Sequence, residues 1–192
     1  MKIHYNAPVI LTFALISTAV TIIGSVTGQS FTELYFSISP NMSFYDPITY
    51  FRLFSHIAGH ANWEHLAGNF SLILLIGPLL EEKYSSALML VMILTTALVT
   101  GLLNIFLFHT GLYGASGIVF MLILLSSFAN LRSGHVPLTF IIVVCLFLGK
   151  EFVNAFHNDT ISQFAHIIGG LCGSIFGYSK RVKPDIESAE AI

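Results

Sequence analysis

Long apolar segments separated by polar connections dominate the chain. A helix needs about 20 mostly apolar residues to cross a bilayer, and six segments approach or reach that length. They predict transmembrane helices at residues 8–27, 61–80, 86–108, 113–131, 138–156 and 161–178. We therefore expect an all-α membrane protein, a six-transmembrane-helix bundle in which residues 1–192 form a single membrane-embedded domain.

The connections between these helices are unequal. Residues 28–60 form a long connection that mixes aromatic, proline and polar residues with few charges. A long semi-apolar connection of this kind is expected to pack on the bundle or to lie in the membrane interface. The chain has no internal repeat, so a transporter built from inverted repeats has little support.

Composition agrees with a membrane protein. Apolar residue types make up 55% of the chain and charged types 9%, with a mean hydropathy of +0.80. Soluble domains carry about 25% charged residues. The net charge of −2 and the lack of a basic stripe argue against nucleic acid as a partner. Both cysteines, Cys145 and Cys172, lie in apolar segments and are expected to be free thiols.

The first apolar segment could be a signal peptide instead of a helix. Signal sequences have an apolar core of about 7–15 residues followed by a small-x-small cleavage site. The segment after Pro8 is longer and lacks a convincing site. We interpret it as a transmembrane helix that is retained.

The basic residues predict the orientation. Cytoplasmic connections of membrane proteins are enriched in Lys and Arg. With a cytoplasmic N-terminus, only Arg52 and Lys150 lie at the outer side, and both termini are cytoplasmic. The basic residues then on the cytoplasmic side are Lys2, Lys83, Arg132, Lys180, Arg181 and Lys183. The second, fourth and sixth helices all start at the outer face in this arrangement.

Four polar residues on these three helices would share one depth in the membrane. His65 and Asn69 lie in the first turns of the second helix, Ser116 in the first turn of the fourth, and His166 near the start of the sixth. At 1.5 Å rise per residue they lie roughly 5–12 Å below the helix starts. Polar groups inside a membrane are costly and are therefore candidates for function.

Ser116 has the context of a nucleophile. Many membrane serines only bond back to their own helix backbone. Ser116, however, lies between Gly114-Ala115 and Gly117 at a predicted helix start. Glycines permit close approach, and a helix N-terminus favours developing negative charge.

His166 lies on a helix face made of small residues. Gly169, Gly173 and Gly177 follow at four-residue spacing, which favours close helix packing. Packing alone explains the glycines but gives no use for a titratable side chain. We expect His166 to reach the Ser116 hydroxyl and to accept its proton.

His65 and Asn69 are four residues apart and share a helix face. Both side chains can donate hydrogen bonds. They could form the side-chain half of an oxyanion hole, with the Ser116 backbone N–H as the other half. An interhelical hydrogen-bonded pair explains the spacing equally well.

A metal site is a competing interpretation of the histidines near residue 60. Metalloproteases use His-Glu-x-x-His or His-x-x-Glu-His on a helix. His60, Glu64 and His65 fit neither spacing. We predict no metal and no cofactor, and interpret His56 and His60 as part of a solvated cluster in the interface.

The chain resembles the rhomboid family, specifically the six-helix bacterial GlpG-type enzymes. The residues that carry the resemblance are His65-x-x-x-Asn69, Gly114-Ala115-Ser116-Gly117 and Ala165-His166-x-x-Gly169-x-x-x-Gly173. The resemblance implies an intramembrane serine protease with a Ser116–His166 dyad, acting on transmembrane protein substrates within the lipid bilayer. It implies a bacterial inner membrane location and an active site that opens to the periplasmic side. Gly114, Gly117, Phe120, Gly169 and Gly173 would support the site.

The resemblance also implies a lid over the site and shows two departures. The lid would be the connection at about residues 154–161. Relatives often carry Trp-Arg in the first connection, where this chain has Phe51-Arg52. Many carry a tyrosine four residues after the serine, stacked on the catalytic histidine, where this chain has Phe120. The aromatic ring is kept and the hydroxyl is lost.

Two other functions fit a small polytopic membrane protein less well. A catalytically inactive rhomboid-like protein that binds membrane clients would be expected to lose the serine or the histidine, and both are present. A small transporter or channel would place paired acids or a lysine within the apolar spans. The only candidates in the sequence are Lys150 and Glu151, near the outer end of the predicted fifth helix.

Overall fold

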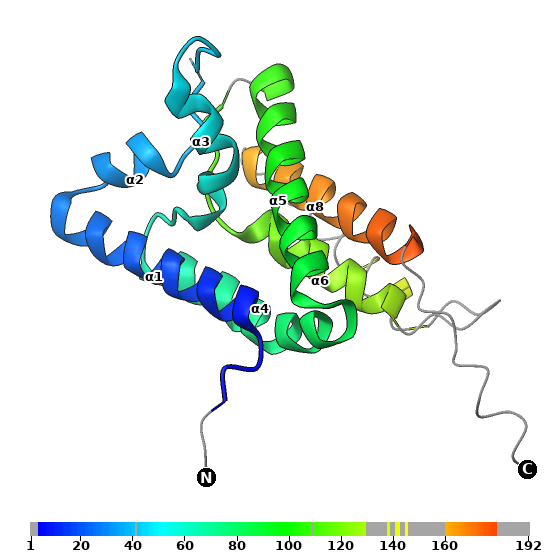
Figure 1. The fold of residues 1–192 in the computed structure, drawn as a ribbon. Helices are drawn as coiled ribbons and strands as arrows, with labels where there is room; N and C mark the ends of the chain where they lie inside the picture. Colours follow the sequence, from blue (N-terminus) through cyan, green and yellow to red (C-terminus); the bar gives the residue numbers. More distant parts are fainter. Residues whose placement is uncertain are drawn as a thin grey trace, which may run out of the picture.

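The computed structural model describes residues 4–40, 42–108, 110–129, 138, 141–142, 145 and 160–179, without the side chains of 129 and 160–163. The predicted fifth helix lies almost wholly outside these residues, as does most of the predicted lid. Within the described part the fold is helical, apart from one isolated bridge between Ile38 and Leu112. Figure 1 shows the arrangement.

Within the described residues, three helices are long and apolar enough to span a membrane. They are α1 (Pro8–Thr27), α4 (Trp63–Tyr84), and α5 (Ser86–Leu103) with its π-helical extension η2 (Asn104–Phe108). Two shorter apolar stretches lie in α6 (Ser116–Ala129) and α8 (Thr160–Ser179). The predicted second helix was placed too early at both ends, and the predicted fourth helix began three residues too early.

The N-terminus of α1 is capped by a side chain from another helix. Ala7 offers no side-chain cap, but Glu81 of α4 accepts hydrogen bonds from the backbone N–H groups of Val9 at 2.9 Å and Ile10 at 3.0 Å. The first N–H groups of a helix need such partners, and a carboxylate also complements the helix dipole. Glu81 is buried. Sequence reasoning ended the second helix at residue 80 and so missed this acid.

The long connection between α1 and α4 is folded onto the bundle, one of the two expected arrangements. It forms α2 (Ser30–Tyr35), α3 (Pro47–Ser55) and the 3₁₀ turn η1 (His56–Ala58). Ser55 Oγ donates to the Tyr35 carbonyl at 2.6 Å, and Arg52 Nε donates to the Leu34 carbonyl, which ties α3 to α2. In Figure 1, α3 packs against α5.

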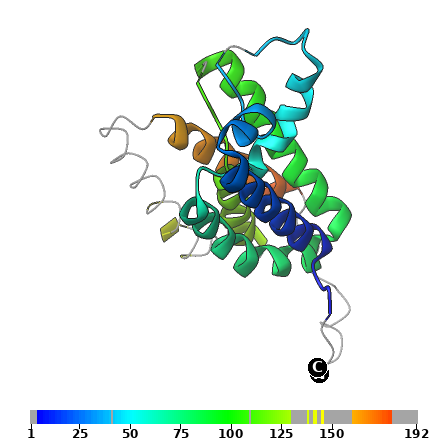
Figure 2. The same cartoon turned by 90° about the vertical axis from the view of Figure 1, so that its left-hand side faces the viewer.

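Helix α6 lies at the centre of the fold. It contacts α4, α5 and α8, while α1 packs along α4 (Figures 1 and 2). Ile118, Met121, Leu122 and Leu125 of α6 are at most 1% exposed. The start of α6 is therefore held by helices from distant parts of the chain.

Candidate active site

The segment before α6 is held by side-chain bonds to the end of α5. Asn104 Nδ2 donates to the Thr110 carbonyl at 2.7 Å, and Thr110 Oγ1 donates to Asn104 Oδ1 at 3.2 Å. Asn104 is 1% exposed, so its side of both bonds is buried. Sequence reasoning missed this pair, although a lone Asn at the end of an apolar helix is a usable signal.

The same segment is also bonded to the first connection. Leu112 and Ile38 exchange backbone hydrogen bonds of 2.8 and 3.0 Å, and Gly114 N–H donates to the His56 carbonyl at 2.9 Å. These bonds hold the chain in a non-helical path up to Ser116, the first residue of α6. Ser116 thus has a fixed backbone at a helix N-terminus.

Gly114 allows side chains of α4 to lie close against this segment. Its φ is +122°, a conformation that favours glycine. A Cβ there would lie 2.8 Å from His65 Cε1 and 3.0 Å from His65 Nε2, with Asn69 Nδ2 at 3.9 Å. Two residues before Ser116, the chain therefore passes directly over the His65 and Asn69 side chains.

The Asn69 amide has an unused donor. Asn69 is 9% exposed, and its Nδ2 has no hydrogen-bond partner among the residues described. An unsatisfied buried donor costs about 1–3 kcal/mol. Such a donor is available to an acceptor that binds later, for example a reaction oxyanion.

His65 presents a donor to the same place. Its Nδ1 accepts a long hydrogen bond of 3.5 Å from the Ala61 N–H. That bond assigns the proton to Nε2, the ring nitrogen nearest Gly114. His65 is also near enough to His166 for the two rings to interact electrostatically.

Helices α6 and α8 are in backbone contact. A Cβ on Gly169 would clash with the Gly117 carbonyl and lie 2.9 Å from Gly117 Cα. A Cβ on Gly173 would meet the Met121 backbone in the same way, at 2.9 Å from its Cα. The four-residue glycine spacing on α8 therefore faces α6, as predicted.

His166 is 8% exposed and lies at this close crossing. Its ring is 4.4 Å from the Phe120 ring, centroid to centroid, at an interplanar angle of 44°. The carbonyl of the preceding residue, Ala165, would lie 3.2 Å from a Cβ on Gly117. Ser116 and His166 thus adjoin the residues at which the two helices touch.

His56 and His60 are not in a solvated cluster; both are 1% exposed. Each ring has a backbone partner, with His56 Nδ1 3.1 Å from the Arg52 carbonyl and His60 Nδ1 3.2 Å from the Ala58 carbonyl. Burial lowers the pKa of each to about 4, and nearby His65 adds to the lowering at His60. The described residues contain no group of three or more His, Cys, Asp or Glu suited to a metal.

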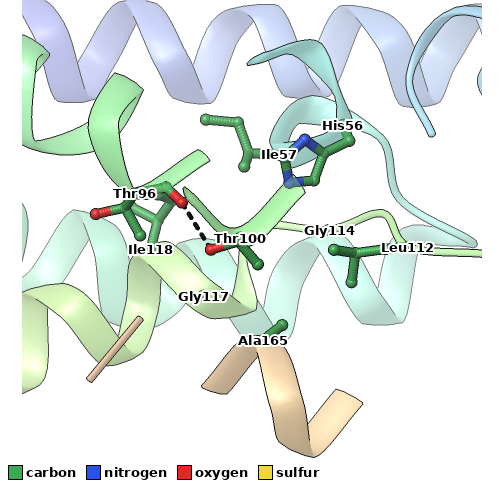
Figure 3. A pocket seen from close by; sticks show the side chains of 9 residues that line it. All are labelled: His56, Ile57, Thr96, Thr100, Leu112, Gly114, Gly117, Ile118 and Ala165. Atoms are coloured by element: carbon green, nitrogen blue, oxygen red, sulfur yellow. Dashed lines mark hydrogen bonds between the residues drawn. The ribbon is translucent and has the colours of Figure 1, made fainter. Parts of the chain in front are cut away.

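A small cavity of about 10 Å³ adjoins the same segment (Figure 3). Such a volume holds about one water molecule. Thr100 points toward it and donates to the Thr96 carbonyl at 2.6 Å. The lining residues are His56, Ile57, Thr96, Thr100, Leu112, Gly114, Gly117, Ile118 and Ala165.

The family of the chain follows from a match over most of its length. The rhomboid domain model matches residues 47–182, which include every residue of the candidate site. The chain belongs to the rhomboid family. A search of curated proteins found no match.

Membership in the family assigns no role to any one of these residues. Within this rhomboid protein, α4, α6 and α8 bring His65, Asn69, Gly114, Gly117 and His166 around the start of α6. Phe120 lies on the His166 ring. Their catalytic and supporting roles stay predictions.

Proposed function

We propose that this rhomboid protein is an intramembrane serine protease. It hydrolyses peptide bonds in or near transmembrane segments of membrane-protein substrates, with Ser116 as nucleophile and His166 as general base. The observation that carries the proposal is the unpaired Asn69 amide beside Gly114, two residues before Ser116. A protein that only binds clients has no need of an unpaired donor at that place.

The chemistry follows the Ser–His pattern. His166 takes the Ser116 hydroxyl proton as Oγ attacks the scissile carbonyl carbon. The oxyanion accepts hydrogen bonds from Asn69 Nδ2, His65 Nε2 and the Ser116 backbone N–H, which has no intrahelical partner at a helix start. His166 then gives its proton to the leaving amine. In the second step His166 takes a proton from the water that attacks the acyl carbonyl carbon, and it returns that proton to Ser116 Oγ as the ester bond breaks. The reaction needs no metal and no cofactor.

The site opens to the periplasmic side of a bacterial inner membrane, with both termini in the cytoplasm. The distribution of Lys and Arg supports this orientation. Substrates reach the site as extended segments of other membrane proteins, because a peptide bond inside a helix is shielded from attack. The active enzyme and a client-binding protein of the same fold differ in one measurable property, the reactivity of Ser116.

Covalent labelling tests that property. A fluorophosphonate probe should label the detergent-solubilised protein once, at Ser116, and Ser116→Ala should remove the label. His166→Ala should fold as the wild type does and lose nearly all labelling, because an unassisted serine hydroxyl is a poor nucleophile. Equal labelling of the wild type and Ser116→Ala would show that Ser116 is not reactive. It would exclude the protease and favour the client-binding protein.

A further inference from the structure

His60 has no part in the proposed chemistry, yet its ring is hydrogen-bonded to the backbone just before Ser116. It lies in the turn between η1 and α4 and is 1% exposed. Its Nδ1 is 3.2 Å from the Ala58 carbonyl, and its Nε2 is 3.4 Å from the Ala115 backbone nitrogen. A carbonyl can only accept, so Nδ1 carries the proton and Nε2 accepts the Ala115 N–H.

The ring is held in this orientation by its neighbours. His65 packs edge-on against it at 5.0 Å between centroids, and Phe70 lies at 5.8 Å. Burial keeps the pKa of His60 at about 4, so at neutral pH the ring is uncharged and the Nε2 lone pair is available. A protonated ring would lose that acceptor.

The bond completes a set that fixes three successive peptide units, from residue 113 to residue 116. Gly114 N–H donates to the His56 carbonyl at 2.9 Å, and the Ala115 carbonyl accepts the Val119 N–H at 3.0 Å. With Ala115 N–H bonded to His60, both N–H groups before Ser116 have partners. The Ala115 N–H is thereby occupied, which leaves the Ser116 N–H as the nearest backbone donor for an oxyanion.

We propose that His60 is a positioning residue for the proposed protease reaction: its neutral Nε2 holds the Gly114–Ala115 peptide so that Ser116 Oγ and N–H face the reacting carbonyl. The inference rests on the proposed function. It predicts a defect in turnover and not in substrate binding, because His60 touches the backbone before the nucleophile and not the substrate.

The test compares two His60 variants with a control. In a cleavage assay on a membrane-spanning test substrate, His60→Leu should lower kcat about 10²-fold with KM near wild type, as expected for a misplacement of about 1 Å. His60→Gln, whose amide oxygen can accept from Ala115 N–H, should recover at least about tenfold of that loss. The control is Leu80→Ala, a buried truncation at the far end of α4. It should lower Tm and keep the wild-type kcat at a temperature where it is folded.

A backbone variant covers the case in which His60→Leu does not fold. Replacing Ala115 by lactic acid changes the N–H to an ester oxygen and leaves every side chain in place. Its kcat should fall to about the level of His60→Leu. A protein that carries both changes should have a kcat no lower than that of either single variant.

Failure of this inference differs from failure of the proposed function. A wild type that neither cleaves nor labels would sink the protease assignment and this inference with it. A cleaving wild type accompanied by wild-type kcat in His60→Leu or in the ester variant would overturn the inference alone. So would a His60→Gln kcat no higher than that of His60→Leu.

Discussion

Gly169 of α8 lies directly against the backbone of Gly117 of α6, one residue after Ser116. No side chain separates the two helices at this crossing, because both residues are glycines. The position of His166 relative to Ser116 therefore depends on the absence of a Cβ at Gly117 and Gly169. Backbone contact of this kind is short-ranged and stiff. It predicts that a single methyl group on α8 changes turnover.

Gly169→Ala should lower kcat about 10²-fold, because the added Cβ must displace α8 and with it His166. The matched control is Gly68→Ala on α4, where a Cβ would have no neighbour within 4 Å. Cleavage rates of the two purified variants, with circular dichroism to compare helix content, measure the difference. Wild-type turnover in Gly169→Ala would mean that this crossing does not position the site.

Asn69→Ala tests the oxyanion site. Removing one such donor costs about 10²–10³ in kcat in a soluble protease, and a smaller effect is expected here because other donors remain. KM should change little, since the bond strengthens only as the oxyanion forms. Asn69→Leu, which keeps the volume and removes the amide, should behave the same. Unchanged kcat in both would assign Asn69 a structural role.

Acidification should destabilise the fold through His56 and His60. Both have a folded-state pKa of about 4, below the usual 6.5, so the unfolded chain takes up protons first. Stability is therefore fully present above pH 6.5 and is lost as the pH falls toward about 4, by about 3 kcal/mol for each histidine. Tm in detergent should drop between pH 7 and pH 5, and the drop should shrink in His56→Phe. A Tm that does not change over this range would contradict the burial of both rings.

Orientation can be tested from one exposed position. Ala115 is fully buried and unsuited to labelling, whereas Gly111 is exposed and has room for a side chain. Gly111→Cys, in a Cys145→Ser/Cys172→Ser background, should react with a membrane-impermeant maleimide from the periplasmic side. Labelling only from the cytoplasmic side would reverse the proposed topology.

Sequence patterns predicted the apolar helices of the described residues within a few residues of their ends, because length and hydropathy follow from the bilayer. The predicted fifth helix stays a prediction. The start of α6 was missed because Leu112 and Gly114 bond to residues 38 and 56, which no local pattern indicates. The end of α4 was missed because a charged residue, Glu81, usually ends an apolar segment, whereas here it caps α1.

The candidate site was predictable only in part. Shared depth and glycine spacing indicated which helices would meet, since both follow from helix geometry. The burial of His56 and His60 was not predictable, because their ring partners are backbone carbonyls whose positions depend on the folded turn. The unpaired Asn69 Nδ2 is likewise a property of packing and is visible only once Gly114 is placed.

The proposed protease cleaves peptide bonds in membrane proteins with Ser116 and His166 and without a metal. The most direct test is a cleavage assay on a membrane-spanning test substrate, using purified wild type, Ser116→Ala and His166→Ala in detergent or liposomes. We expect cleavage by the wild type, none by Ser116→Ala, almost none by His166→Ala, and no effect of EDTA. Full cleavage by Ser116→Ala, or loss of wild-type cleavage with EDTA alone, would contradict it.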